Sequence, residues 1–212
     1  MLQDRLIDIA IREFGEKGLD GASTRGIAGA ADTAMSSITY HYGGKEGLYL
    51  AAADHIAEQM SREMLSLLDL EDPVALADAA AARAKIHYIL CLLIDRMLGE
   101  KSAAWSMFII REQLLPGAAF DRIYDKAMGR LLGHLVDLVC VATGVSADAQ
   151  IRVAVFLMTA QVFALRSARG VMLRLAGEDG TVESFTNSLK HEITLSTNAT
   201  LDRLTTDRQE TA

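Results

Sequence analysis

The hydrophobic positions of this chain follow helical spacing almost from end to end. Near the N-terminus, Leu6, Ile9, Ala10 and Phe14 recur at intervals of three and four residues, which predicts an amphipathic helix over 2–17. The same reading predicts further helices over 24–31, 35–41, 45–68, 74–98, 102–115, 118–143, 147–170 and 181–204. We therefore expect an all-α protein of nine helices, followed by a polar, flexible tail at 205–212.

A second pattern is confined to residues 23–48, where two short helices are joined by a tight turn. Ser23 suits the N-cap of the first, Asp32 and Thr33 form the turn, and Gly43 with Gly44 ends the second. In a helix-turn-helix unit the second helix enters the major groove of DNA. The pattern predicts a DNA-binding domain over 1–47 and a larger helical domain over 48–204, with the boundary inside the fourth helix.

Hydroxyl and aromatic side chains dominate the second of these short helices. Hydroxyl groups of serine and threonine can contact base edges, and side chains at a helix end are better placed for phosphate oxygens. Arg25 can contact a guanine edge or a phosphate. The candidate DNA contacts are Ser23, Thr24, Arg25, Ser36, Ser37, Thr39, Tyr40, His41 and Lys45.

The net charge of the chain limits how it could bind DNA. The chain carries a net charge of −7, and its first fifty residues contain more acidic than basic side chains. A protein that binds DNA mainly by neutralising phosphates would be basic here. We expect weak non-specific binding that depends on a few placed cations, on helix N-termini and on the geometry of a dimer.

Two motifs resemble a known family. The sequences T-R-x-I-A at 24–28 and I-T-Y-H-Y-x-x-K-E-x-L at 38–48 resemble the DNA-binding domain of the TetR family of bacterial regulators. FIIREQLLP at 108–116 and the segment around Tyr124 resemble the CecR-like subgroup. The chain departs from the usual Gly-Val at the turn, where it has Asp32 and Thr33, but aspartate tolerates a left-handed backbone.

The resemblance implies a TetR-like architecture and a homodimeric repressor. Such a protein binds a palindromic DNA operator and is released by a small-molecule effector held in the C-terminal bundle. The aromatic candidates for that pocket each also suit an ordinary core, and Arg111 also suits a solvated helix face or an intramolecular ion pair. The candidates are Trp105, Phe108, Arg111, Phe120, Tyr124 and Phe163. The last two expected helices would form the dimer interface through Phe156, Val162, Phe185, Leu189 and Ile193.

Two other classes stay open. One is a ligand-independent DNA-binding protein with a filled bundle, and the other is a helical carrier or scaffold with a vestigial helix-turn-helix. An enzyme is not expected, because the histidines lack zinc-ligand spacing and no glycine-rich phosphate loop follows a strand. The sequence therefore predicts no catalytic residue, metal or cofactor.

Composition also bears on the compartment. Cys91 and Cys140 lie in apolar helical patterns, which favours reduced, buried thiols. No signal peptide is visible, and the apolar stretch 153–165 is shorter than the roughly 20 residues that span a bilayer. We expect a cytoplasmic protein that makes no contact with a membrane.

Overall fold

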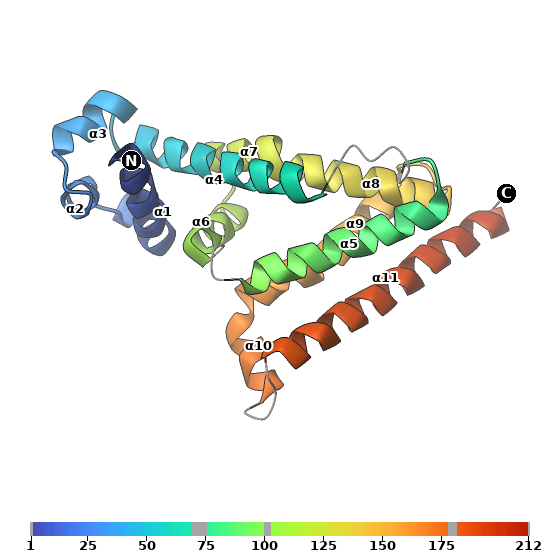
Figure 1. The fold of residues 1–212 in the computed structure, drawn as a ribbon. Coiled ribbons are helices and arrows are strands. Elements are labelled where there is room, and N and C mark those ends of the chain that lie inside the picture. The colour runs from blue at the N-terminus through green and yellow to red at the C-terminus, as the bar shows by residue number, and fades with distance from the viewer. Residues whose placement is uncertain (1, 69–75, 100–102, 178–181, 212) are drawn as a thin grey trace. The chain divides into compact units, whose positions relative to one another are not determined.

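The computed structural model describes residues 2–68, 76–99, 103–177 and 182–211 (Figure 1). No strand occurs within these ranges, and the expected all-α class is confirmed. The helices are α1 (Leu2–Gly21), α2 (Thr24–Ala30), α3 (Met35–Tyr42), α4 (Lys45–Leu68), α5 (Ala79–Leu98), α6 (Ala103–Leu114), α7 (Ala118–Ile123), the π-helical turn η1 (Tyr124–Met128), α8 (Gly129–Thr143), α9 (Ala149–Ser167), α10 (Arg169–Ala176) and α11 (Val182–Thr211).

The chain forms two compact units. One comprises residues 1–67 and 100–130, and the other comprises 68–99 and 131–212. This division differs from the expected boundary at residues 47 and 48, because α6 returns to pack against α1 and α7 packs on α6. The helix-turn-helix and α4 as far as Leu67 therefore belong to one unit together with α6 and α7.

The first unit has a continuous apolar core beneath α2 and α3. Phe14 of α1 lies edge-on to Tyr49 of α4, with ring centroids 4.9 Å apart, and Tyr49 in turn contacts Phe108 of α6 at 4.7 Å. Buried aliphatic side chains complete this core; they include Leu6, Ala10, Ile27, Ala28, Ile38, Leu48, Ala52 and Ile56. Most of them occupy the helical spacing that the sequence pattern predicted.

Several helix boundaries differ from the sequence prediction. Gly18 does interrupt helical geometry, with φ 72°, but α1 resumes and continues to Gly21. The helix expected from residue 74 begins at Ala79, because the Asp78 side chain accepts a hydrogen bond from the N–H of Ala81 at 2.7 Å and caps it. Residues 74 and 75 lie outside the described residues.

The C-terminal half also departs from prediction. The single helix expected over 118–143 contains the π-helical turn η1, and the one expected over 147–170 is divided at Ala168 into α9 and α10. The helix expected to end at residue 204 continues as α11 to Thr211, so residues 205–211 of the expected tail are helical. Leu204 is almost fully buried near that point and anchors the helix to its unit.

In the second unit, α9 packs against α5 and α11. An Arg83–Asp202 ion pair of 2.6 Å also joins α5 to α11. Two predicted dimer residues, Val162 and Ile193, are 0% and 6% exposed, so they fill the core of the second unit. They are not available to a second chain.

The opposite side of α9 remains apolar and open. Val153, Phe156 and Leu157 are 56%, 67% and 60% exposed. Among the described helices, α9 is the one long and apolar enough to be a candidate membrane span. Of its most apolar segment, 39% is buried in the protein. A core helix of a soluble protein passes the same test, and the inner side of α9 is core.

Candidate nucleic-acid interface

The two short helices are held in place by their caps. The Ser23 hydroxyl accepts a hydrogen bond from the N–H of Gly26 at 3.2 Å, which confirms the predicted N-cap of α2. Between the helices, Asp32 adopts φ 57°, the left-handed conformation expected of it at this turn. The helix-turn-helix geometry therefore forms without the glycine that is usual there.

The junction between α3 and α4 depends on two glycines. Gly43 ends α3 with φ 73°, and its N–H donates to the carbonyl of Thr39 at 3.0 Å. A Cβ atom on Gly47 would lie 1.7 Å from the backbone oxygen of Tyr42. Sequence reasoning missed Gly47, because the close approach of the two backbones is visible only in three dimensions.

Helix α3 turns a polar, aromatic side outward. Ile38 is its buried residue, whereas Ser36, Thr39 and His41 are exposed and Tyr40 is 85% exposed. Ser37 is partly buried, and its hydroxyl oxygen accepts a hydrogen bond from Thr33 at 3.2 Å. Most of the predicted contacts on this helix therefore share one accessible surface.

The cations of this region are largely engaged within the protein. Lys45 donates to the carbonyl oxygen of Asp20 at 2.8 Å, and Arg5 donates to that of Ala30 at 3.2 Å. Lys17 pairs with Glu13 on α1 at 2.7 Å. Arg25 is exposed in the first turn of α2, beside the partly buried Thr24.

Arg111 connects α6 to the end of α1. Its guanidinium donates to the carbonyl of Gly15 at 3.3 Å and to that of Glu16 at 3.0 Å. These carbonyls precede the break at Gly18, where helical partners are lost and a cation is favoured. Arg111 therefore takes part in the packing of α6 against α1.

Glu112 is the buried acidic residue beside it. One carboxylate oxygen accepts from the hydroxyl of Tyr49 at 2.5 Å, and the other accepts from the N–H of Phe120 at 2.9 Å, in the first turn of α7. Burial raises the pKa of the Tyr49 hydroxyl above its ordinary value, and the bond to Glu112 adds to that rise. This contact fastens α4, α6 and α7 together.

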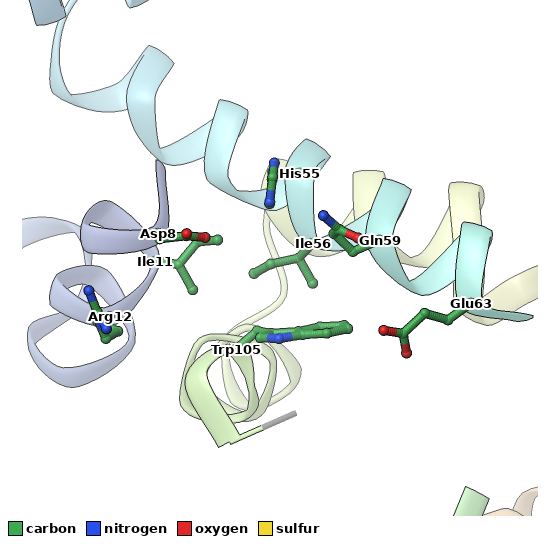
Figure 2. A pocket seen from close by; sticks show the side chains of 8 residues that line it. All are labelled: Asp8, Ile11, Arg12, His55, Ile56, Gln59, Glu63 and Trp105. Atoms are coloured by element: carbon green, nitrogen blue, oxygen red, sulfur yellow. The ribbon is translucent and has the colours of Figure 1, made fainter. Parts of the chain in front are cut away.

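The six predicted effector residues are divided between the two units. Phe108 is 1% exposed and belongs to the core. Phe120 and Tyr124 stack on each other with centroids 5.8 Å apart, and Phe163 belongs to the second unit. Of the six, Trp105 alone lines the pocket that opens between α1, α4 and α6 (Figure 2).

The other side chains around that pocket were not predicted. They are Asp8, Ile11 and Arg12 of α1 and His55, Ile56, Gln59 and Glu63 of α4. The i, i+4, i+8 spacing of His55, Gln59 and Glu63 could have shown that they share one side of a helix. The sequence could not show that α6 brings Trp105 to that side.

Comparison with known proteins agrees with this geometry. Residues 6–52 match the family model of bacterial regulatory proteins of the tetR family, and residues 82–201 match the C-terminal domain of the HTH-type transcriptional dual regulator CecR. The chain is 31% identical over 198 residues to CecR of Shigella flexneri, covering 90% of this chain and 86% of that protein. It is also 36% identical over 69 residues to the regulatory protein RaaS of Mycobacterium tuberculosis, about a third of either chain.

Solved structures share the fold. A TetR-like transcriptional regulator from Rhodococcus sp. RHA1 superposes with a TM-score of 0.61 at 18% identity, covering 93% of this chain and 96% of that one. AibR, solved with isovaleryl coenzyme A and operator DNA, gives 0.61 at 18% identity, covering 90% and 96%.

A helix-turn-helix whose second helix is exposed, carried by a long helical chain, defines a helix-turn-helix transcriptional regulator rather than an enzyme. The chain belongs to the TetR family, and within it to regulators of the CecR-like type.

Proposed function

We propose that this protein is a cytoplasmic, homodimeric repressor that binds a palindromic operator and is released by a small-molecule effector. The observation that carries the proposal is the outer side of α3. Its exposed groups include hydroxyls, an imidazole and a phenol, together with Met35 in its first turn, whereas Ile38 is buried in the core of the first unit. A helix of this kind presents hydrogen-bonding groups to a groove while its position is fixed from behind.

The proposed contacts follow from this exposure. Ser36, Ser37 and Thr39 face base edges, and Tyr40 and His41 reach phosphates near the end of α3. Ser23, Thr24 and Arg25 lie at the start of α2, where the free N–H groups and the dipole favour a phosphate. Lys45 keeps donors to spare beyond the one it gives to Asp20, because an ammonium group carries three.

A second copy of the chain is the proposed cover for the outer side of α9. Val153, Phe156 and Leu157 are exposed there at i, i+3, i+4 spacing, and Leu195 of α11 is 50% exposed. Phe185 and Leu189, also on α11, are half-buried and belong to the proposed interface. Burying these side chains against a partner is favourable by roughly 25 cal/mol for each Å² of apolar surface removed from water.

Release by an effector requires differential binding. A molecule that binds the DNA-competent and the incompetent conformations equally well shifts neither population. The related fold of AibR was solved with both an acyl coenzyme A and operator DNA, which supports an effector-binding function for this architecture.

The DNA contacts are tested by selecting a binding sequence from random duplexes and then measuring operator affinity for variants. Arg25→Ala and Tyr40→Ala should each weaken operator binding by about tenfold to a hundredfold, because each removes a contact worth roughly 1–3 kcal/mol. Lys17→Ala is the matched control, since Lys17 is an exposed cation of the same unit that pairs with Glu13. Unchanged operator affinity in both the Arg25→Ala and the Tyr40→Ala variant would overturn these contacts. Failure to select any DNA sequence would overturn the proposed function.

A further inference from the structure

The first turn of α3 exposes an apolar side chain at the end of the helix that would meet the bases. Met35 is the first residue of α3 and is 51% exposed. Ala34, the N-cap residue before it, is also exposed and carries only a methyl group. In a helix-turn-helix, the N-terminal residues of the second helix contact base edges in the major groove. The part of α3 that would reach the bases is therefore apolar.

The composition of α3 limits how this helix can distinguish one base pair from another. Its eight residues, MSSITYHY, include no arginine, lysine, asparagine or glutamine. Those four side chains make the bidentate hydrogen bonds by which guanine and adenine are recognised in the major groove. Serine and threonine hydroxyls can bond to several kinds of base edge. Hydrogen bonds from α3 alone therefore discriminate weakly between base pairs.

Thymine offers the apolar contact that suits this helix. Its C5-methyl group lies in the major groove, and apolar side chains recognise it there. The side chain of methionine is unbranched and polarizable, so it adapts to such a surface. The first fifty residues contain more acidic than basic side chains, so attraction to phosphates contributes less than in a basic protein. Removal of apolar surface from water accordingly carries a larger share of the affinity.

We propose that Met35 is a specificity-determining residue that recognises thymine by apolar contact with its C5-methyl group. This inference rests on the proposed insertion of α3 into the major groove, and it adds the base that is recognised and the side chain that recognises it. It depends on neither an effector nor a repressor function. A DNA sequence selected by this protein should therefore contain a thymine whose methyl group contributes to affinity.

Replacement of thymine by uracil tests the contact, because uracil lacks the methyl group and keeps the same hydrogen-bonding edges. The full chain is used to select a binding sequence from random duplexes. Each thymine of that sequence is then replaced by deoxyuridine, with symmetry-related positions replaced together, and the affinity is measured again. At one such position or more, we expect the affinity of the unaltered chain to fall by about fivefold to fifteenfold.

Variants of the protein connect this loss to Met35. Met35→Ala should lower the affinity for the selected sequence, and its response to uracil at the sensitive position should be less than about twofold. Met35→Leu keeps an apolar side chain of similar size and should retain most of the response.

Met107→Ala is the matched control. Met107 is also 51% exposed and belongs to the same unit, but it lies on α6. This variant should retain both the affinity of the unaltered chain and its response to uracil. Thermal melting curves establish that all three variants are folded.

Two results would contradict the role of Met35 while DNA binding itself persists. One is a selected sequence that lacks thymine, or in which no uracil replacement weakens binding. The other is an equal response to uracil in the Met35→Ala and Met107→Ala variants. Failure to select any sequence would instead remove the proposed function, and this inference with it. The first result needs only the unaltered chain, so the proposal can be tested even if a variant does not fold.

Discussion

At the scale of single residues, the adjacent Arg111 and Glu112 support the DNA-binding helices from behind. Arg111 contacts the carbonyls at the end of the first part of α1, and Glu112 accepts hydrogen bonds from Tyr49 and from the backbone of Phe120. A charged residue inside a core is tolerated when its hydrogen bonds are satisfied. These two residues show why the apolar pattern of α6 is interrupted.

Glu112→Ala should destabilise the protein. It leaves the Tyr49 hydroxyl and the Phe120 N–H without their acceptor, at a cost of about 1–3 kcal/mol for each group that remains buried. Urea denaturation measures the change in the free energy of unfolding. Gln113→Ala, at the exposed neighbouring position, should stay within about 0.5 kcal/mol; equal losses in the two variants would contradict the role of Glu112.

At the scale of elements, close contact between helices fixes what the fold tolerates. The start of α4 approaches the end of α3 so closely that only glycine fits at position 47. At Gly29, on α2, an added Cβ would meet no atom within 4 Å. A tertiary contact therefore requires glycine at position 47, whereas neither space nor backbone angle requires it at position 29. The two positions form a matched pair for substitution.

Gly47→Ala should lower the free energy of unfolding by about 2–4 kcal/mol, because backbone atoms must move apart. Gly29→Ala should leave it unchanged or raise it by up to about 1 kcal/mol, since alanine favours the helix. Thermal or urea unfolding distinguishes the two. Equal stabilities would show that α3 and α4 separate easily.

The contact of α5 with α11 contains a histidine whose titration affects stability. Burial lowers the pKa of His87 below 6.5, the nearby Arg83 lowers it further, and a hydrogen bond with Asn198 opposes the change. The folded state therefore binds a proton less readily than the unfolded chain. Its stabilising contribution is present above pH 6.5 and is lost as the pH falls toward the pKa of the folded state.

His87→Gln should reduce the fall in unfolding free energy between about pH 7.5 and about pH 5, because the substituted side chain does not titrate. Urea denaturation at a series of pH values measures this slope. His191→Gln, at an exposed position on α11, is the control and should retain the slope of the unaltered protein. The same slope in both variants would contradict the assignment to His87.

At the scale of the whole molecule, the two sides of α9 have different surroundings. Its inner side fills the core of the second unit, and its outer side leaves Val153, Phe156 and Leu157 exposed. An apolar patch of this kind marks an interaction surface in a monomer. Pairing of two chains would also hold two reading helices at a fixed spacing, which a weakly charged DNA-binding unit requires.

Phe156→Glu should convert the proposed dimer to a monomer, because it places a charge at the centre of the apolar surface. Analytical ultracentrifugation measures the mass. Affinity for a full operator should fall by about a hundredfold or more, while affinity for half of the operator should not change. Leu114→Glu, on the exposed end of α6, should remain dimeric; a dimeric Phe156→Glu variant would place the interface elsewhere.

The sequence by itself determined the all-α class, the helix-turn-helix and the family. Hydrophobic spacing and caps such as Ser23 and Gly43 are local features, so they can be identified without knowing which helices meet. Tertiary structure alone decided the partners of those helices: that α6 packs on α1, that Val162 and Ile193 point inward, and that Trp105 lines a pocket with Glu63. Periodicity shows that a helix has an apolar side, but only packing of residues distant in sequence determines what covers it.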